Sequence, residues 1–106
     1  MLDKQKLGRI GEDIAVKYLV KRKYRIIERN FKCKIGEIDI IAKDKDELVF
    51  IEVKSRTSNQ YGNPVDAVNE NKQKHIHKSA EYYVYINGAE NEYIRFEVIE
   101  IYFREK

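Results

Sequence analysis

The sequence predicts one α/β domain with the element order α-β-β-β-α-β, in which helices flank a mixed central sheet. A β-hairpin pattern occupies the middle of the chain, and a stretch with helical spacing of apolar residues lies on each side of it. The length of 106 residues suits a single domain. The first three strands can form an antiparallel meander. Because a helix separates the third strand from the fourth, those two strands should run parallel, with a right-handed crossover.

The composition excludes several classes of protein. Charged residues make up 37% of the chain and hydrophobic residues 42%, which indicates a globular protein and not a disordered one. The net charge of +3 permits a polyanionic partner without requiring one. The single cysteine, Cys33, excludes an internal disulfide framework and fits a reducing compartment. No window approaches the roughly 18 apolar residues of a membrane span, so we expect a cytoplasmic protein without membrane contact.

The first predicted helix runs from Asp3, which can cap it, to about Lys23. Gly8 and Gly11 fall on or beside its apolar stripe, where each costs about 1 kcal/mol of helix propensity. Close packing against a sheet is the expected compensation. The residues predicted to face the core recur at spacings of three and four: Leu7, Ile10, Ile14 and Tyr18, widened by Ala15 and Leu19.

Glu12 borders this stripe, because it lies four residues after Gly8 and three before Ala15. Two interpretations are open. The side chain is either solvated or paired with an arginine, or it points into the same cavity as the carboxylates of the hairpin that follows.

A first strand is predicted from Tyr24 to Phe31, and a turn from Asn30 to Lys34 leads into the hairpin. The hairpin spans Ile35 to Arg56, with two runs rich in Ile, Val and Phe. The five residues between the runs, Lys43 to Glu47, are all charged and suit a solvent-exposed turn.

The hairpin register brings carboxylates together. If the turn is centred between Lys45 and Asp46, Asp39 lies directly opposite Glu52. Like charges in opposite positions cost from a few tenths to about 1 kcal/mol per pair, so this pattern indicates a site that binds a cation. One predicted face is entirely apolar: Ile38, Ile40, Ala42, Val49, Ile51 and Val53. The other face carries Glu37, Asp39, Ile41, Phe50, Glu52 and Lys54.

The second half of the chain predicts a helix and a strand. Pro64, after a polar loop, suits the first turn of a helix that breaks near Asn69 and restarts. The main helix then runs to about Ile86 and ends at Asn87-Gly88. Its buried stripe comprises Ile76, Ala80 and Tyr83, with Gln73 one turn earlier on the same face.

The last predicted strand runs from Tyr93 to Phe103. Its apolar phase shifts between Val98 and Ile99, which predicts a bulge or a strand that leaves the sheet.

The paired carboxylates have a definite chemistry. Asp39 and Glu52 are hard oxygen ligands suited to Mg²⁺, which could polarise a phosphate oxygen and orient an attacking water. Lys54, on the same face as Glu52, could stabilise developing charge or position that water. The alternative is a plain surface ion pair between Glu52 and Lys54. Glu37 is either a further ligand or the cross-strand partner of Lys54.

Five stretches carry a resemblance to a known family: GRIGEDIAVKYL, RNFKCKIGEIDIIA, VFIEVKSR, GNPVDAV and KQKHIHKSAEYY. Over roughly residues 8 to 101, the chain resembles the YraN family of uncharacterised, predicted endonuclease-like proteins. That family resembles in turn the PD-(D/E)xK, or restriction-endonuclease-like, nuclease superfamily, whose core has the same αβββαβ order. The proline of the superfamily motif is replaced here by Ile38, so this half of the motif survives only as Asp39.

The resemblance implies roles for particular residues. Asp39 and Glu52 would be metal ligands, joined by the backbone carbonyl of Val53, and Lys54 would be the catalytic lysine. Glu12 matches a first-helix glutamate that can help to hold metal. Gln73 matches a second-helix glutamine beside the site.

We therefore expect a Mg²⁺-dependent endonuclease, with Mn²⁺ as a substitute, that hydrolyses phosphodiester bonds in nucleic acid. DNA is favoured, including branched or repair-intermediate DNA. Arg56, Tyr61 and Lys72 are candidate phosphate contacts, each with ordinary surface as the alternative. A homodimer through the C-terminal strand is a candidate assembly. Two rivals stay open: a non-cleaving nucleic-acid-binding or scaffold protein with this fold, and a protein-interaction module.

Overall fold

The computed structural model describes residues 3–57 and 70–104, and the predicted α/β fold class is confirmed. One four-stranded sheet has the order β1-β2-β3-β4, in which β4 runs parallel to β3 and the other neighbours are antiparallel, as predicted. The predicted helical turn at Pro64 and the break near Asn69 lie outside the described residues. The elements are α1 Lys4–Lys21, β1 Arg25–Lys32, β2 Glu37–Asp44, β3 Glu47–Thr57, α2 Glu70–Ile86 and β4 Tyr93–Phe103.

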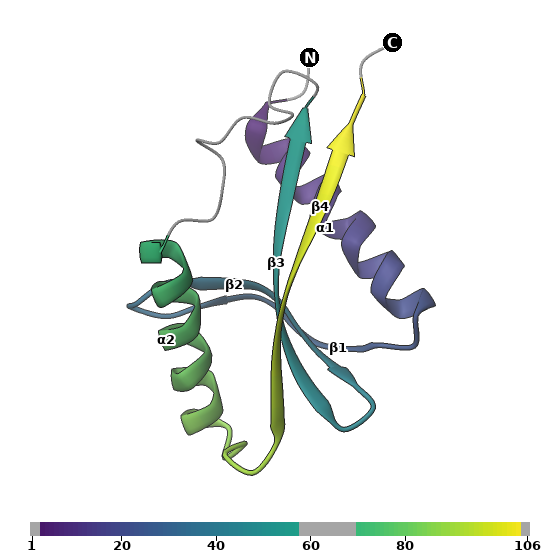
Figure 1. The fold of residues 1–106 in the computed structure, drawn as a ribbon. Helices are drawn as coiled ribbons and strands as arrows, with labels where there is room; N and C mark the ends of the chain where they lie inside the picture. Colours follow the sequence, from purple (N-terminus) through teal and green to yellow (C-terminus); the bar gives the residue numbers. More distant parts are fainter. Residues whose placement is uncertain (1–2, 58–69, 105–106) are drawn as a thin grey trace.

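The sheet is the middle layer of three (Figure 1), because each helix covers a separate core cluster. Under α1, Ala15 and Leu19 pack on Ile40, Ala42, Val49 and Ile51. Under α2, Ala80 and Tyr83 pack on Phe31, Ile38, Ile41, Leu48 and Phe50. No helix in the described ranges is long and apolar enough to cross a membrane.

The prediction of a single apolar hairpin face is wrong at Ile38, which belongs to the α2 cluster, whereas Ile40 belongs to the α1 cluster. Two residues of one strand therefore pack on opposite sides, so the alternation of side chains breaks at Asp39. On the neighbouring strand, Asn30 has a positive φ of 55° at the same level. The second face is also apolar over much of its length, since α2 covers Ile41.

Helix α1 begins as predicted, because Asp3 Oδ1 accepts a hydrogen bond from the Lys6 N–H at 2.8 Å. The predicted buried stripe is confirmed at Ala15 and Leu19 and is wrong at three other positions. The side chains of Ile10, Ile14 and Tyr18 are exposed, and the buried positions are Gly11, Glu12, Ala15 and Leu19.

Close packing at one glycine accounts for this orientation of α1. A Cβ atom on Gly11 would lie 2.0 Å from Ser55 Oγ on β3. The helix therefore presents its glycine and alanine side to the sheet, since only small residues allow this approach, and the bulkier stripe faces outward.

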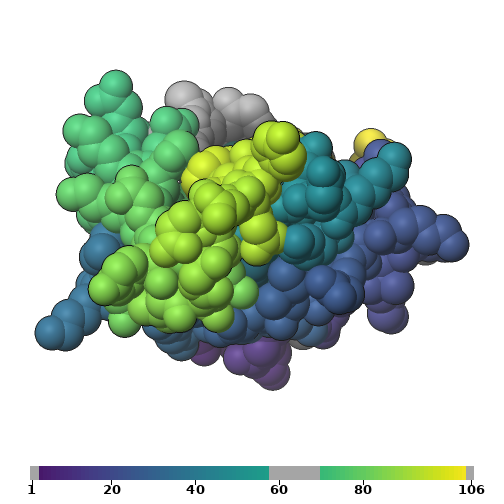
Figure 2. All heavy atoms as spheres, turned by 90° about the horizontal axis from the view of Figure 1, so that it is seen from below, coloured from purple at the N-terminus to yellow at the C-terminus, as the bar shows by residue number. Residues whose placement is uncertain are grey.

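Strand β4 pairs with β3 in one uninterrupted register from Glu47↔Tyr93 to Thr57↔Phe103, so the predicted bulge, or departure of the strand from the sheet, is wrong. The apolar phase shifts because Arg95 and Glu97 occupy inward-facing positions that Ile99 continues. At the end of the sheet where β3 and β4 begin, the α2–β4 connection and the β2–β3 turn lie side by side (Figure 2).

Candidate functional site

The site lies where β2 and β3 separate. Regular pairing runs from the turn to Ile40 opposite Ile51, in the predicted register. Beyond this pair, the Asp39 side chain and not its backbone bonds to β3: its Oδ2 accepts a hydrogen bond of 2.7 Å from the Val53 N–H. The Asp39 carboxylate is therefore fixed against β3 beside Glu52.

Three other carboxylates lie near Asp39. Burial, followed by the nearby Glu52 carboxylate, raises the pKa of Asp39 to about 7 from its ordinary 3.8. Glu12 and Glu37 act in the same direction, and the hydrogen bond from Val53 offsets only part of the effect. A buried carboxylate in this condition gains from a nearby cation.

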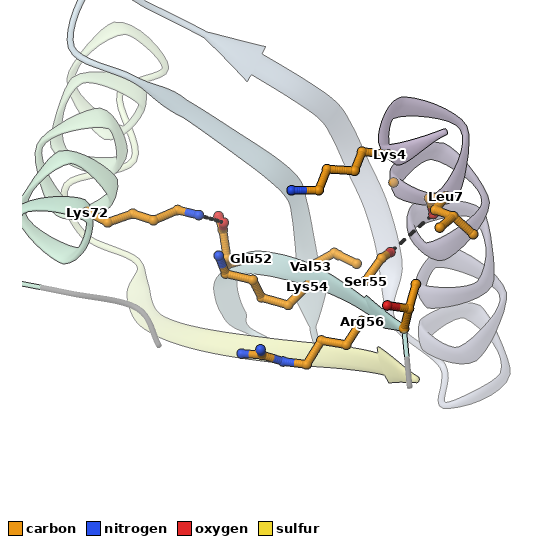
Figure 3. Close-up of a pocket in the computed structure, with 10 residues that line it drawn as sticks. Lys4, Leu7, Glu52, Val53, Lys54, Ser55, Arg56 and Lys72 are labelled. Carbon is orange, nitrogen blue, oxygen red and sulfur yellow. Dashed lines mark hydrogen bonds and ion pairs between the residues drawn. The ribbon is translucent and has the colours of Figure 1, made fainter. Parts of the chain in front are cut away.

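Glu52 has a cation already, supplied by α2 (Figure 3). Lys72 Nζ lies 3.0 Å from Glu52 Oε1, and the Glu52 side chain is only 11% exposed. The contact with Lys72, followed by burial, lowers the pKa of Lys54. Burial lowers the pKa of Lys72, but the contact with the Glu52 carboxylate outweighs it and the pKa is raised overall.

These residues border a basic hollow of about 380 Å³. Side chains from three elements line it: Lys4 from α1, Lys54 and Arg56 from β3, and Lys72 from α2 (Figure 3). Among the described residues that line this hollow, Glu52 is the single acidic one. We call this feature the basic hollow, and its charge suits a phosphate group.

A second hollow lies on the α1 side and contains Asp39 and Glu12, with Val53 shared between the two hollows. Glu12 is 8% exposed, and its Oε1 accepts hydrogen bonds from Arg29 Nε at 2.9 Å and Asn30 Nδ2 at 3.0 Å. Both interpretations of Glu12 therefore hold, because it pairs with an arginine and also lines the hollow of Asp39.

The other candidate residues have varied positions. Gln73 is exposed and lines, with Glu52, a third hollow between α2 and β4. Arg56 lines the basic hollow, and its Nε donates a hydrogen bond of 2.8 Å to Glu100 on β4. Tyr61 lies outside the described residues.

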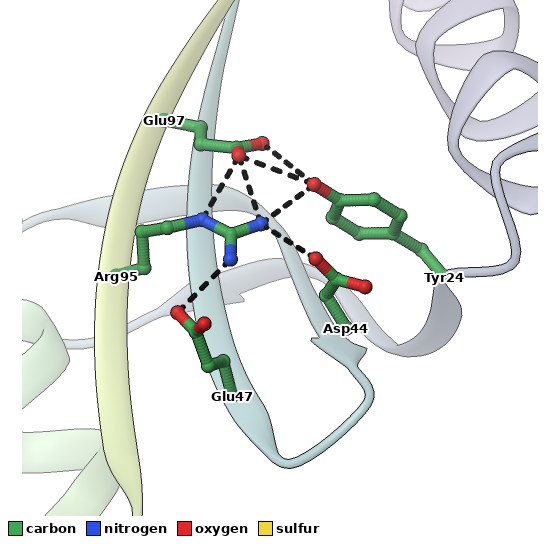
Figure 4. A network of polar contacts seen from close by, with 5 residues as sticks. All are labelled: Tyr24, Asp44, Glu47, Arg95 and Glu97. Carbon is green, nitrogen blue, oxygen red and sulfur yellow. Dashed lines mark hydrogen bonds and ion pairs between the residues drawn. The ribbon is translucent and has the colours of Figure 1, made fainter.

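A different polar cluster, at the other end of the sheet, contains carboxylates that are paired with a cation (Figure 4). Arg95 forms ion pairs of 2.9 to 3.1 Å with Asp44, Glu47 and Glu97. Its Nη2 also donates a hydrogen bond of 2.6 Å to the Tyr24 hydroxyl. One arginine thus serves three carboxylates there, whereas Asp39 has a backbone N–H beside further negative charge.

The donors around Asp39 would suit a hard divalent ion. Two carboxylates, Asp39 and Glu52, and the Val53 carbonyl are all oxygen donors, and Mg²⁺ usually keeps several waters besides one or two protein carboxylates. In the described ranges, no three His, Cys, Asp or Glu side chains come together to hold a metal by themselves. Glu12 as a further ligand therefore stays a prediction, since its Oε1 is engaged by Arg29 and Asn30.

Sequence reasoning missed two residues near the site. Lys4 lines the basic hollow, and Arg29 holds Glu12. A signal for Lys4 was present, because Lys4, Gly8 and Glu12 recur at a spacing of four and so share one side of α1. Nothing in the sequence pattern points to Arg29.

The chain is similar to many proteins of one family. A family model described as "Uncharacterised protein family UPF0102" matches residues 11–101. A UPF0102 protein of Clostridium perfringens is 54% identical over 98 residues, covering 92% of this chain and 80% of the relative. A UPF0102 protein of Clostridioides difficile is 48% identical over 106 residues, covering 100% and 92%. YraN is another name for this family, so the predicted family is confirmed, and membership of the nuclease superfamily stays a prediction. The chain therefore belongs to the UPF0102 family.

Proposed function

We propose that the protein is a Mg²⁺-dependent nuclease that hydrolyses phosphodiester bonds in nucleic acid, with DNA favoured. One observation carries the proposal: two adjoining carboxylates, Asp39 and Glu52, stand beside a hollow lined by four cationic side chains. This combination offers hard ligands for a metal next to a surface for a phosphate.

Some residues would bind the metal ion, and Lys54 would act on the water or the phosphate. Asp39, Glu52 and the Val53 carbonyl would hold Mg²⁺ or Mn²⁺, which when bound supplies Lewis-acid polarisation of the phosphate and an activated water. Lys54 follows Glu52 by two residues on β3 and lines the basic hollow. Its lowered pKa favours a lysine that can position the attacking water or stabilise developing negative charge.

The remaining residues would bind and orient. Lys4, Arg56 and Lys72 line the basic hollow and would contact phosphate oxygens. Glu12 would position the α1 side of the site through its bonds to Arg29 and Asn30. A homodimer through β4 would place two such sites against two backbones.

Cleavage assays test the proposal directly. Linear, flapped and four-way DNA and RNA are incubated with Mg²⁺ or Mn²⁺ and wild-type protein, Asp39→Asn or Glu52→Gln. We expect cleavage of at least one substrate by the wild type and its loss in both variants. Glu28→Gln, at an exposed position on β1, is the matched control and should cleave like the wild type. Undiminished cleavage by Asp39→Asn or Glu52→Gln would rule out the mechanism.

A non-cleaving nucleic-acid-binding protein is the second candidate. The observation in its favour is that Glu52 and Glu12 are already paired with Lys72 and Arg29. This candidate predicts salt-sensitive DNA binding without cleavage under any divalent metal, and little effect of Lys54→Ala on affinity.

A further inference from the structure

Lys72 and Glu52 form an ion pair, although the proposed function has Glu52 bind a metal ion and Lys72 bind a phosphate. Lys72 Nζ lies 3.0 Å from Glu52 Oε1, at the distance of a direct ionic hydrogen bond. The Glu52 side chain is 11% exposed and the Lys72 side chain 41% exposed. An ammonium group from α2 thus already occupies a cation position beside this carboxylate.

A divalent ion on Glu52 would meet this ammonium group at short range. Like charges a few ångströms apart repel strongly where burial limits screening by water. Lys54 adds a further positive charge next to Lys72. The Lys72–Glu52 contact and a metal on Glu52 therefore oppose each other.

The Lys72 side chain can move away from Glu52 without a change in the backbone. It lies in the first turn of α2, whose position is set further along by Ala80 and Tyr83 in the core, so the ammonium can move by rotation of side-chain bonds alone. Lys72 already lines the basic hollow, and a phosphodiester bound there would supply acceptor oxygens for the displaced group.

We infer that Lys72 is an internal counter-ion of Glu52, which a divalent metal displaces, and that the displaced ammonium then binds the substrate phosphate. The inference rests on the proposed function and deepens it. It makes metal binding and nucleic-acid binding mutually supportive, since each ligand favours the state in which Lys72 has left Glu52.

Direct metal binding to the full chain, without nucleic acid, tests the exchange. Mn²⁺ is titrated into wild type, Lys72→Met and Lys72→Arg, and free Mn²⁺ is followed by electron paramagnetic resonance. Lys72→Met should bind Mn²⁺ at least about fivefold more tightly than wild type, the low end of typical coupling between two ligands. Lys72→Arg keeps the positive charge and should stay within about twofold of wild type. Lys74→Met is the matched control and should bind like wild type, because Lys74 lies two residues further along α2, on a different side of the helix, and outside the described lining of the basic hollow.

A second titration measures the other half of the exchange. Fluorescence anisotropy of a labelled DNA is recorded with and without Ca²⁺, as a metal chosen to bind without supporting turnover. Wild type should bind DNA more tightly with the metal, and Lys72→Met should lose most of that gain. Circular dichroism of each variant confirms that it is folded.

The outcomes separate the two proposals. Equal Mn²⁺ affinity of wild type and Lys72→Met, with affinity lost in Glu52→Gln, overturns the exchange and leaves the metal site standing. Absence of Mn²⁺ binding by wild type and Glu52→Gln alike overturns the metal site, and the exchange with it.

Discussion

Replacement of Asp39 by asparagine should stabilise the protein in the absence of metal, and more so as the pH rises. The amide oxygen can still accept the hydrogen bond from the Val53 N–H, so the change mainly removes a titratable negative charge. In the folded protein, burial and Glu52 raise the pKa of Asp39 to about 7, compared with 3.8 for an ordinary aspartate. Ionisation is therefore unfavourable in the folded state, and wild-type stability from this group is present at low pH and lost as the pH rises towards 7.

The size of the effect follows from the two pKa values. The interval between them corresponds to roughly 4 kcal/mol at about 1.4 kcal/mol per pH unit. About 2 to 3 kcal/mol of this should be lost between about pH 5 and about pH 8. The asparagine variant should not show this loss, so its advantage over wild type should grow by that amount across the same range.

Urea unfolding of both proteins near pH 5 and near pH 8, with a chelator present, measures this difference. Added Mg²⁺ should close the gap at the higher pH by stabilising only the wild type. A free-energy difference that is the same at both pH values, or that favours wild type more at the higher pH, would refute this view of the Asp39 environment.

Three further changes test other parts of the structure. Gly11→Ala places a Cβ atom 2.0 Å from Ser55 Oγ and should cost about 1 to 3 kcal/mol in urea unfolding. Gly8→Ala, where a Cβ meets nothing within 4 Å, should instead stabilise α1 by up to about 1 kcal/mol; equal effects of the two substitutions would contradict the packing account. Arg95→Met leaves three carboxylates without their shared cation and should cost about 1 to 2 kcal/mol near neutral pH. The loss should shrink at high ionic strength because salt screens partly exposed ion pairs, and a loss independent of salt would count against an electrostatic role.

Much of the sheet could be predicted from sequence because local rules determine it. The charged turn and the alternation of apolar residues set the hairpin register, which placed Ile40 opposite Ile51. That register in turn predicted that Asp39 and Glu52 would be neighbours. The hydrogen bond that the Val53 N–H donates to the Asp39 side chain was not predictable, because it depends on the strands separating at this point.

Packing decided what the patterns left ambiguous. Helix α1 has two sides that could be buried, and the contact between Gly11 and Ser55, not hydrophobicity, selects the side with Ala15. On β4, Arg95 and Glu97 interrupt an apolar face without disturbing the backbone, so a polar cluster resembled a bulge. The partner of Glu52 could not be predicted either, since Lys72 reaches it only through the placement of α2 on the sheet.

Asp39 and Glu52 are proposed to hold a metal ion that supports hydrolysis of nucleic acid. The most direct measurement is the initial rate of cleavage of a labelled DNA by wild type and Glu52→Gln, each over a range of Mg²⁺ concentrations. We expect a wild-type rate that rises with Mg²⁺ to a plateau and no rate above background for Glu52→Gln. Equal rates for the two proteins, or cleavage by wild type that persists in excess chelator, would contradict this proposal.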